Sequence, residues 1–363
     1  MSTHPEILVF ATKGHGSNEE ERILGLLGEL PRDHFAFDRK NRPGSALRLF
    51  TRLLETRPRL AVMEGSGLGG GLALLLAHCL FGTRFVVSSG DAVGPYLAQR
   101  FPAGKWLFSA YEFALYRLSA GFIGWTPYLA GRALAAGAPR AMYAPGWSDL
   151  VFPADRKQAR AEARRELGIP EGAVAIGIAG SLAWNRAVGY CYGLELIEAL
   201  ARGGAAGKFH VVVMGAGDGL ETLRERVPPQ AQDRAHFTGH LGREALAKSL
   251  LALDYASLPQ STDAVGAYRY TTKLPEYLAA GLPVVVNQIP FAYDLDSGWV
   301  VRLPGESPWD ERFLDSLARF LADARPERAQ TESGQALAAA AQFSKTDQAR
   351  RTSAFLTDLL ARA

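Results

Sequence analysis

A lysine and a glutamate three residues apart, at the start of a short predicted helix, could together hold an anion and a sugar hydroxyl. They lie in TTKLPEYLAAGLPVVVN, residues 271–287, where Thr272 is a suitable N-cap and Gly281 ends the helix. Lys273 falls in the first turn, where the helix dipole disfavours a cation by ~0.3–1 kcal/mol unless a bound anion reverses the balance. Glu276 shares its face and can accept hydrogen bonds from vicinal hydroxyls. The alternative is an exposed ion pair worth ~0.3 kcal/mol.

A glycine turn follows the first predicted strand of the second half of the chain and could hold a phosphate. It reads GSLAWNR, from Gly180 to Arg186. Because no acidic residue stands in this run, we expect the backbone amides of Gly180 and Ser181 to be free to meet an anion. Arg186 can add charge-assisted hydrogen bonds. A second turn, MGAGDG at residues 214–219, lacks dinucleotide-motif spacing, and we expect it to be structural.

The first strand of the chain is also followed by two glycines, Gly14 and Gly16, in ATKGHGSNEEERI. The third glycine of a dinucleotide fingerprint is missing, and three glutamates from Glu19 onward would repel a pyrophosphate. One hypothesis is that this loop lines a cleft that receives a neutral or hydroxylated group, with His15 as a contact. The alternative is a tight turn in front of a capped helix, with a solvated histidine.

A carboxylate follows the fourth predicted strand, in VVSSGDAVG. Asp91 could position an attacking hydroxyl or accept its proton, because a base must lie within hydrogen-bond reach of that group. An aspartate that caps a turn or helix is the alternative.

Short β-branched and aromatic runs alternate with amphipathic segments along the chain, which indicates βα units around parallel sheets. We expect an α/β chain of two Rossmann-like, doubly wound domains, at residues 1–150 and 151–345, followed by a final helix within 346–363 that could pack on either domain. The predicted strands are 7–10, 35–37, 61–63, 85–87, 122–125 and 142–144, then 174–179, 210–214, 236–238, 255–258, 284–287 and 300–303. Ligands of such sheets bind at the carboxyl ends of the strands.

Composition narrows the class of protein. The 363 residues include 40 basic and 37 acidic side chains, so a net charge of +3 argues against a nucleic-acid coat. The longest apolar stretch, residues 68–81, is shorter than the ~20 residues that cross a bilayer, and the start of the chain does not resemble a secretory signal. Cys79 and Cys191 lie far apart, and we expect buried, reduced thiols in a cytoplasmic protein.

Aromatic residues are concentrated between Trp106 and Trp125, beside Lys105 and Arg117. A buried helix accounts for most of them. The competing interpretation is an apolar acceptor groove or a peripheral contact with the inner face of a membrane, which would suit a lipid-linked or aromatic acceptor.

These motifs resemble one known family. KLPEYLAAGLPVVV is similar to the carboxyl-terminal signature of the retaining GT-B glycosyltransferases, in the large family 4, or group 1, that includes sucrose synthase and bacterial mannosyltransferases. VAIGIAGSLAWNR and HVVVMGAGDGLETL resemble that family's phosphate turn and second glycine turn, and HFTGHLGREALAKSLLALDYASLP resembles its base-contacting loop and helix. The resemblance covers roughly residues 84–363. It implies two domains facing across a cleft, with the acceptor in the first and the nucleotide sugar in the second.

The resemblance also implies roles for individual residues. Glu276 matches the ribose-binding glutamate, and Arg186 matches the basic residue of the phosphate turn. The backbone positions implied at the donor are Gly180 and Ser181 at the phosphate and Gly239 and His240 at the base.

Three departures from the family pattern alter this expectation. Tyr268 stands where many relatives carry a second acidic residue, and Ser181 stands where many carry an arginine. Lys273 supplies a positive charge, as in the subgroup reading PTKLFEYLAAG. Asp91 lies near the place of a strand-four histidine at the reaction centre, and Asp263 could reach the donor sugar or be a loop residue.

We therefore predict transfer of a hexosyl group from a UDP or GDP sugar to an acceptor hydroxyl, as in bacterial polysaccharide or glycoconjugate synthesis. Retention, and no metal or other cofactor, are expected, because Arg186, Lys273 and the Gly180 turn could stabilise the departing diphosphate. His15 and Asp91 are the catalytic candidates on the acceptor side. The alternatives are a catalytically degenerate partner subunit and a nucleotide-sugar epimerase.

Overall fold

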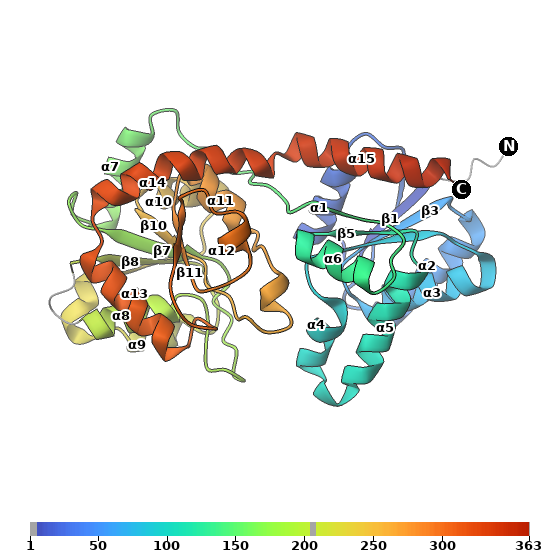
Figure 1. Ribbon diagram of the computed structural model, residues 1–363, viewed down its shortest axis with the longest axis horizontal. Coiled ribbons are helices and arrows are strands. Elements are labelled where there is room, and N and C mark those ends of the chain that lie inside the picture. Colours follow the sequence, from blue (N-terminus) through green and yellow to red (C-terminus); the bar gives the residue numbers. More distant parts are fainter. Residues whose placement is uncertain (1–5, 204–207, 363) are drawn as a thin grey trace. The chain divides into compact units, whose positions relative to one another are not determined.

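The computed structural model describes residues 6–203 and 208–362, in two compact units (Figure 1). Unit 1 comprises residues 1–146, 268–270 and 344–363, and unit 2 comprises residues 147–267 and 271–343. The chain thus changes units between Gly146 and Trp147, returns to unit 1 for three residues, and returns again for its last helix.

Unit 1 is built on a parallel six-stranded sheet in the order β2-β1-β3-β4-β5-β6. Its strands are β1 (Ile7–Ala11), β2 (Asp33–His34), β3 (Leu60–Glu64), β4 (Phe85–Ser89), β5 (Gly121–Gly124) and β6 (Ala141–Tyr143). Its helices are α1 (Asn18–Leu27), α2 (Arg42–Thr56), α3 (Leu68–Phe81), α4 (Val93–Arg100), α5 (Lys105–Leu118), α6 (Pro127–Ala135) and α15 (Lys345–Ala361). The last helix packs against α1 (Figure 1).

Unit 2 repeats the plan with the order β12-β11-β10-β7-β8-β9, again all parallel. Its strands are β7 (Ala175–Ala179), β8 (His210–Met214), β9 (Ala235–Gly239), β10 (Tyr255–Ser257), β11 (Val284–Val286) and β12 (Val300–Arg302). Its helices are α7 (Arg156–Leu167), α8 (Leu194–Gly203), α9 (Leu220–Glu225), α10 (Arg243–Leu251), α11 (Lys273–Ala280), α12 (Phe291–Asp294), α13 (Glu311–Asp323) and α14 (Pro326–Ala339). Two α/β units with parallel sheets confirm the predicted fold class.

Each sheet is covered by its own apolar core, because strands buried on both faces read as continuous runs of apolar residues. This explains why eleven of the twelve strands lie where the sequence placed them. The exception is 35–37, where the strand β2 is only Asp33–His34. Phe35 and Phe37 alternate as in a strand, but they pack edge-on to one another beyond the last paired residue.

Two other local predictions were wrong. Thr272 occupies the N-cap position of α11, but its side chain makes no capping hydrogen bond. Cys79 is exposed, whereas Cys191 is buried as expected. Cys79 lies on α3, whose apolar residues are buried on one side of the helix only. Within the described residues, no helix has the length and hydropathy that a bilayer span requires.

Candidate functional site

In unit 2 the side chain of Lys273 lies against the glycine turn that follows β7. A Cβ built on Gly180 would come within 2.4 Å of Lys273 Cε and 2.9 Å of its Nζ. The ammonium also lies over the ring of Tyr192, 4.3 Å from the centroid, which favours a cation at this point. The first turn of α11 therefore brings a positive charge directly beside the turn predicted to hold phosphate.

A buried tyrosine on α11 fixes this arrangement. The Tyr277 hydroxyl accepts a hydrogen bond of 2.8 Å from the amide of Ala179, the last residue of β7. Burial raises the pKa of this phenol well above its ordinary value, so the group stays neutral. The bond joins the end of the strand to the helix, so it holds Gly180, which follows β7, close to Lys273, which begins α11.

The two glycine turns of unit 2 lock together, and this corrects one expectation. The Gly180 amide donates to the Met214 carbonyl at 2.9 Å, so it is not free to meet an anion. Gly215 and Gly217 of the second turn lie against the backbone of the first turn. A Cβ built on Gly215 would lie 1.9 Å from the Gly180 carbonyl oxygen. The second turn is therefore structural, as predicted, and in the first turn Ser181 is exposed next to the half-buried Gly180.

An aspartate also reaches this turn, although the run of residues itself contains no acid. Asp218, from the second glycine turn, accepts a 2.8 Å hydrogen bond from the Trp184 amide. Arg186 lies just beyond, exposed in a loop that the bridge between Asn185 and Tyr190 closes.

Glu276 sits half-buried one turn further along α11. The pKa of its carboxyl is raised above the ordinary value, mainly by burial. The charges of Lys273 and Arg243 oppose this shift, and the charge of Asp149 adds to it. Arg243 begins α10, immediately after the loop that carries Gly239 and His240. Gly239 has a positive φ of 70°, and His240 is exposed. The predicted base-contacting loop and the predicted ribose glutamate are thus linked through the charge of Arg243.

In unit 1 the loop after β1 is held by Glu20. Ser17 caps α1 by accepting a hydrogen bond from the Glu20 amide, and the Glu20 carboxylate accepts one from the Gly16 amide at 2.7 Å. His15 Nδ1 and His34 Nε2 lie 2.9 and 2.7 Å from the two oxygens of the same carboxylate. The loop is therefore a capped turn, and Glu20 is buried rather than directed at a ligand.

The His15–Glu20–His34 cluster is also the group of described residues that could hold a metal ion, with its ligand atoms within 4.8 Å of one another. The contacts of the Glu20 carboxylate with His15, His34 and the Gly16 amide hold this cluster together without an ion.

Asp91 follows β4, where sequence placed it, and is paired with a residue that sequence did not single out. Arg269 Nε donates to Asp91 Oδ1 at 2.7 Å. The β1 loop reaches the same part of unit 1, because Lys13 lies 6.0 Å from the centroid of the Tyr96 ring on α4. The candidates His15 and Asp91 therefore occupy loops at the carboxyl edge of one sheet, with Gly14 and Gly16 shaping the first loop.

Tyr268 departs from the role that its family position suggests. Its carbonyl accepts a hydrogen bond from Thr126 at 2.7 Å, and its ring packs on the core of unit 1. Asp263, upstream, accepts hydrogen bonds from the amides of Val265 and Gly266, so it is a turn residue.

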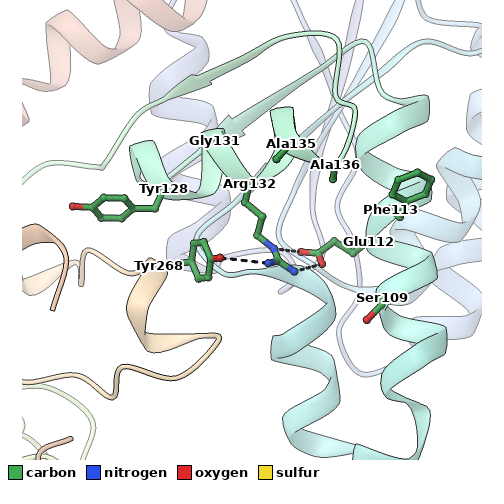
Figure 2. A pocket seen from close by; sticks show the side chains of 9 residues that line it. All are labelled: Ser109, Glu112, Phe113, Tyr128, Gly131, Arg132, Ala135, Ala136 and Tyr268. Atoms are coloured by element: carbon green, nitrogen blue, oxygen red, sulfur yellow. Dashed lines mark hydrogen bonds and ion pairs between the residues drawn. The ribbon is translucent and has the colours of Figure 1, made fainter. Parts of the chain in front are cut away.

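Tyr268 instead borders a pocket of about 610 Å³ in unit 1, between α5 and α6 (Figure 2). Figure 2 shows Arg132 at its centre, bonded to Glu112 through two nitrogens and to the Tyr268 hydroxyl. Phe113 and Tyr128 line the sides. The pocket thus offers aromatic faces around one guanidinium, which could receive a ligand with apolar and polar parts.

Comparison with protein families bears on unit 2. Residues 173–323 match the family model described as "Glycosyl transferases group 1". This span is a group 1 glycosyltransferase domain. The match confirms the predicted enzyme class, and the domain contains Lys273, Glu276 and both glycine turns. The sequence matches none of the curated proteins with which it was compared.

Solved structures resemble the whole chain in fold. The structure of HepE from Anabaena in complex with UDP and glucose has a TM-score of 0.71 at 16% identity, covering 98% of this chain and 100% of that one. Sucrose-phosphate synthase from Thermosynechococcus elongatus has a TM-score of 0.68 at 15% identity, covering 99% and 90%. WaaG, a glycosyltransferase involved in lipopolysaccharide biosynthesis, has a TM-score of 0.65 at 13% identity, covering 96% and 99%. These likenesses confirm the predicted GT-B architecture.

Three residues beside the candidate site were not predicted from the sequence. Tyr192 and Arg243 surround the Lys273–Glu276 pair, and Arg269 binds Asp91. Arg243 could have been suspected from its place four residues after Gly239, at the start of a helix. Nothing in the local pattern marks the other two.

Proposed function

We propose that the chain transfers a sugar from a nucleoside-diphosphate sugar to an acceptor hydroxyl, with the donor bound by the glycosyltransferase domain. The observation that carries the proposal is the Lys273 ammonium against the Gly180 turn, with Glu276 three residues further along the same helix. A cation beside an exposed turn suits a diphosphate, and a half-buried carboxylate suits the ribose hydroxyls. UDP is the favoured nucleotide, because HepE has this fold and was solved with UDP and glucose.

The reaction we propose breaks the bond between the sugar C1 and the diphosphate oxygen, which leaves with the electron pair. The acceptor oxygen forms a new bond to C1 and gives up its proton to a base. Lys273, Ser181 and Arg186 would stabilise the charge that develops on the diphosphate, without a metal or cofactor. Asp91 is the candidate base, with His15 as a contact to the acceptor. We propose retention at C1, which the sequence resemblance supports.

We propose that unit 1 binds the acceptor. The pocket around Arg132 supports an acceptor with an apolar part, because aromatic side chains make up much of its wall. A lipid-linked or aromatic alcohol in the cytoplasm, used for polysaccharide or glycoconjugate synthesis, fits this chemistry.

The experiment is incubation of the purified chain with UDP- and GDP-sugars, with and without a lipid extract as an acceptor pool. The expected result is release of the nucleoside diphosphate, together with a product heavier than its acceptor by one sugar residue. An isomerised nucleotide sugar would indicate an epimerase instead. Tight nucleotide binding with no turnover in any pool would indicate a degenerate partner subunit.

A further inference from the structure

The aromatic ring of Tyr192 lies at the point where Lys273 meets the first glycine turn of unit 2. The Lys273 ammonium is 4.3 Å from the centroid of this ring. The ring also lies next to the turn itself, because a Cβ built on Gly180 would come within 3.6 Å of Tyr192 Cδ2. Tyr192 belongs to the segment that leads into α8, whereas Lys273 begins α11 and Gly180 follows β7. Three segments thus meet around one ammonium, and the reaction proposed above uses only two of them.

Lys273 would be poorly held at this place without a partner. It begins α11, where the helix dipole disfavours a cation, and its charge lies at the end of a flexible four-carbon stem. The attraction of an ammonium to an aromatic face matches or exceeds that dipole penalty. Because the ring contacts the ammonium from one side, the three N–H donors of this group can still reach an anion. The ring therefore holds the ammonium in place and leaves it able to bind phosphate.

A buried carboxylate holds the chain on either side of Tyr192. Glu195 has no exposed surface, and its Oε2 accepts hydrogen bonds from the Tyr190 hydroxyl at 2.9 Å and from the Gly193 amide at 3.1 Å. Its Oε1 accepts a hydrogen bond of 2.8 Å from the hydroxyl of Ser257, the last residue of β10. The rings of Tyr190 and Tyr192 meet edge to face, with their centroids 6.3 Å apart. Glu195 thus ties the residues around Tyr192 to the end of a sheet strand.

We propose that Tyr192 is a positioning residue of the donor site, whose ring holds the Lys273 ammonium beside the Gly180 turn before a diphosphate arrives. The inference rests on the proposed function, namely that unit 2 binds a nucleoside diphosphate at this turn. A lysine that is already ordered loses little further conformational entropy on binding, whereas ordering a mobile lysine lowers the affinity. Tyr192 therefore acts on the ligand through Lys273 and is not a catalytic residue.

Calorimetric titration of the full chain with UDP tests the role of the ring. Tyr192→Phe keeps the aromatic face and should bind UDP as the wild type does. Tyr192→Leu keeps apolar bulk without that face, and we expect about fivefold weaker binding, because the ligand must then order the lysine. Thermal unfolding of each variant verifies that it is folded.

Tyr143→Leu is the matched control for the loss of a ring that contacts a cation. The Tyr143 ring belongs to unit 1, and its centroid lies 4.9 Å from Cζ of Arg351. Because we place the donor site in unit 2, this variant should bind UDP with unchanged affinity.

A double-mutant cycle with Lys273→Met separates positioning from a general packing effect. Lys273→Met alone should weaken UDP binding by about tenfold or more, because a charged hydrogen-bond donor is lost. In the Lys273→Met background, Tyr192→Leu should cause no further loss, since the ring acts only through the lysine. A packing defect at Tyr192 would lower the affinity in both backgrounds.

Two results would overturn the inference and leave the donor site in place. One is an equal UDP affinity in the wild type and the folded Tyr192→Leu variant, and the other is a Tyr192→Leu loss that persists beside Lys273→Met. A Tyr192→Phe variant as weak as Tyr192→Leu would also overturn it, because the hydroxyl and not the ring would then be the group that matters. No binding of UDP, GDP or inorganic pyrophosphate by the wild type would instead contradict the proposed function, and this inference with it.

Discussion

The end of the Lys273 side chain occupies the space in which a β-carbon on residue 180 would sit. The two residues are 93 positions apart in sequence, and they meet because Tyr277 bonds α11 to the end of β7. The Gly180 amide is bonded to Met214, so in the turn predicted to hold phosphate the Lys273 ammonium supplies the positive charge instead. Because of this contact, a larger side chain at residue 180 would displace the positive charge of Lys273.

Gly180→Ala should therefore weaken donor binding. The new methyl group would displace Lys273, and φ at this position is +154°, which L side chains rarely adopt. Strain of this kind costs ~1–3 kcal/mol, so we expect about a tenfold or greater loss of UDP affinity by calorimetry. Gly172→Ala, at an exposed glycine with nothing within 4 Å of its added Cβ, is the control and should leave affinity unchanged.

Asp91→Asn should slow transfer without weakening donor binding, because Asp91 belongs to unit 1 and we propose that the donor binds to unit 2. Loss of a general base typically costs about 10²- to 10⁴-fold in kcat. Initial rates at saturating donor, with UDP affinity measured in parallel, separate the two effects. Asp38→Asn, at an exposed residue of the same unit, is the control. An unchanged kcat in the Asp91 variant would show that this carboxylate forms the ion pair with Arg269 and does not act as the base.

Glu64→Gln should destabilise unit 1 strongly. The Glu64 carboxylate is fully buried and accepts hydrogen bonds from Arg22, Ser88 and Trp125. Removing one member of a buried ion pair costs ~3–5 kcal/mol, because the other charge is left without a partner. Urea unfolding should report a loss of this size.

Glu6→Gln is the matched control for that measurement. Its ion pair with Arg59 is exposed, and such pairs contribute ~0–1 kcal/mol. Adding Arg22→Met to Glu64→Gln should recover part of the stability, and a double variant that is even less stable would show that the two charges are not coupled.

Acid should destabilise unit 2 through a histidine pair on neighbouring strands. His210 Nδ1 and His236 Nε2 lie 2.9 Å apart, and burial, followed by the neighbouring His236, lowers the pKa of His210 to about 4. In the unfolded chain its pKa is near 6.5, so between these values the unfolded state binds more protons. The free energy of unfolding should therefore fall as the pH drops from about 6.5 towards 4. His210→Gln should flatten that slope, while the same change at exposed His240 should not.

The parallel sheets could be predicted from sequence because their strands are short and buried on both faces. Val211, Val212 and Val213 of β8 have no exposed surface, so the apolar run itself marks the strand. The edge strand β2 has no such continuous apolar run, and the alternating Phe35 and Phe37 led to a strand prediction just beyond it. The helix with Lys273 and Glu276 could be placed for a similar reason, since Gly281 and the following proline end it within a few residues.

What sequence could not predict are contacts between distant segments and the side on which an apolar helix is covered. Tyr268 lies in a loop of the second half, yet it packs in unit 1, and no local pattern records that return. The run of leucines in α3 predicts a buried helix, but the packing of the helix on its neighbours decides which leucines are buried. The sequence indicates the charge of Glu20 on α1 but not its contact with His34, which lies on the strand β2.

We propose that unit 2 binds a nucleotide sugar through Glu276 and Lys273. Calorimetric titration of the wild type and of Glu276→Ala with UDP tests it most directly, because the glutamate is expected to bind the ribose and not the protein core. We expect saturable binding by the wild type and an affinity at least about tenfold lower in the folded variant, because a charged hydrogen-bond partner is removed. Equal affinity in the two proteins, or no binding of UDP or GDP by the wild type, would contradict this assignment of the donor site.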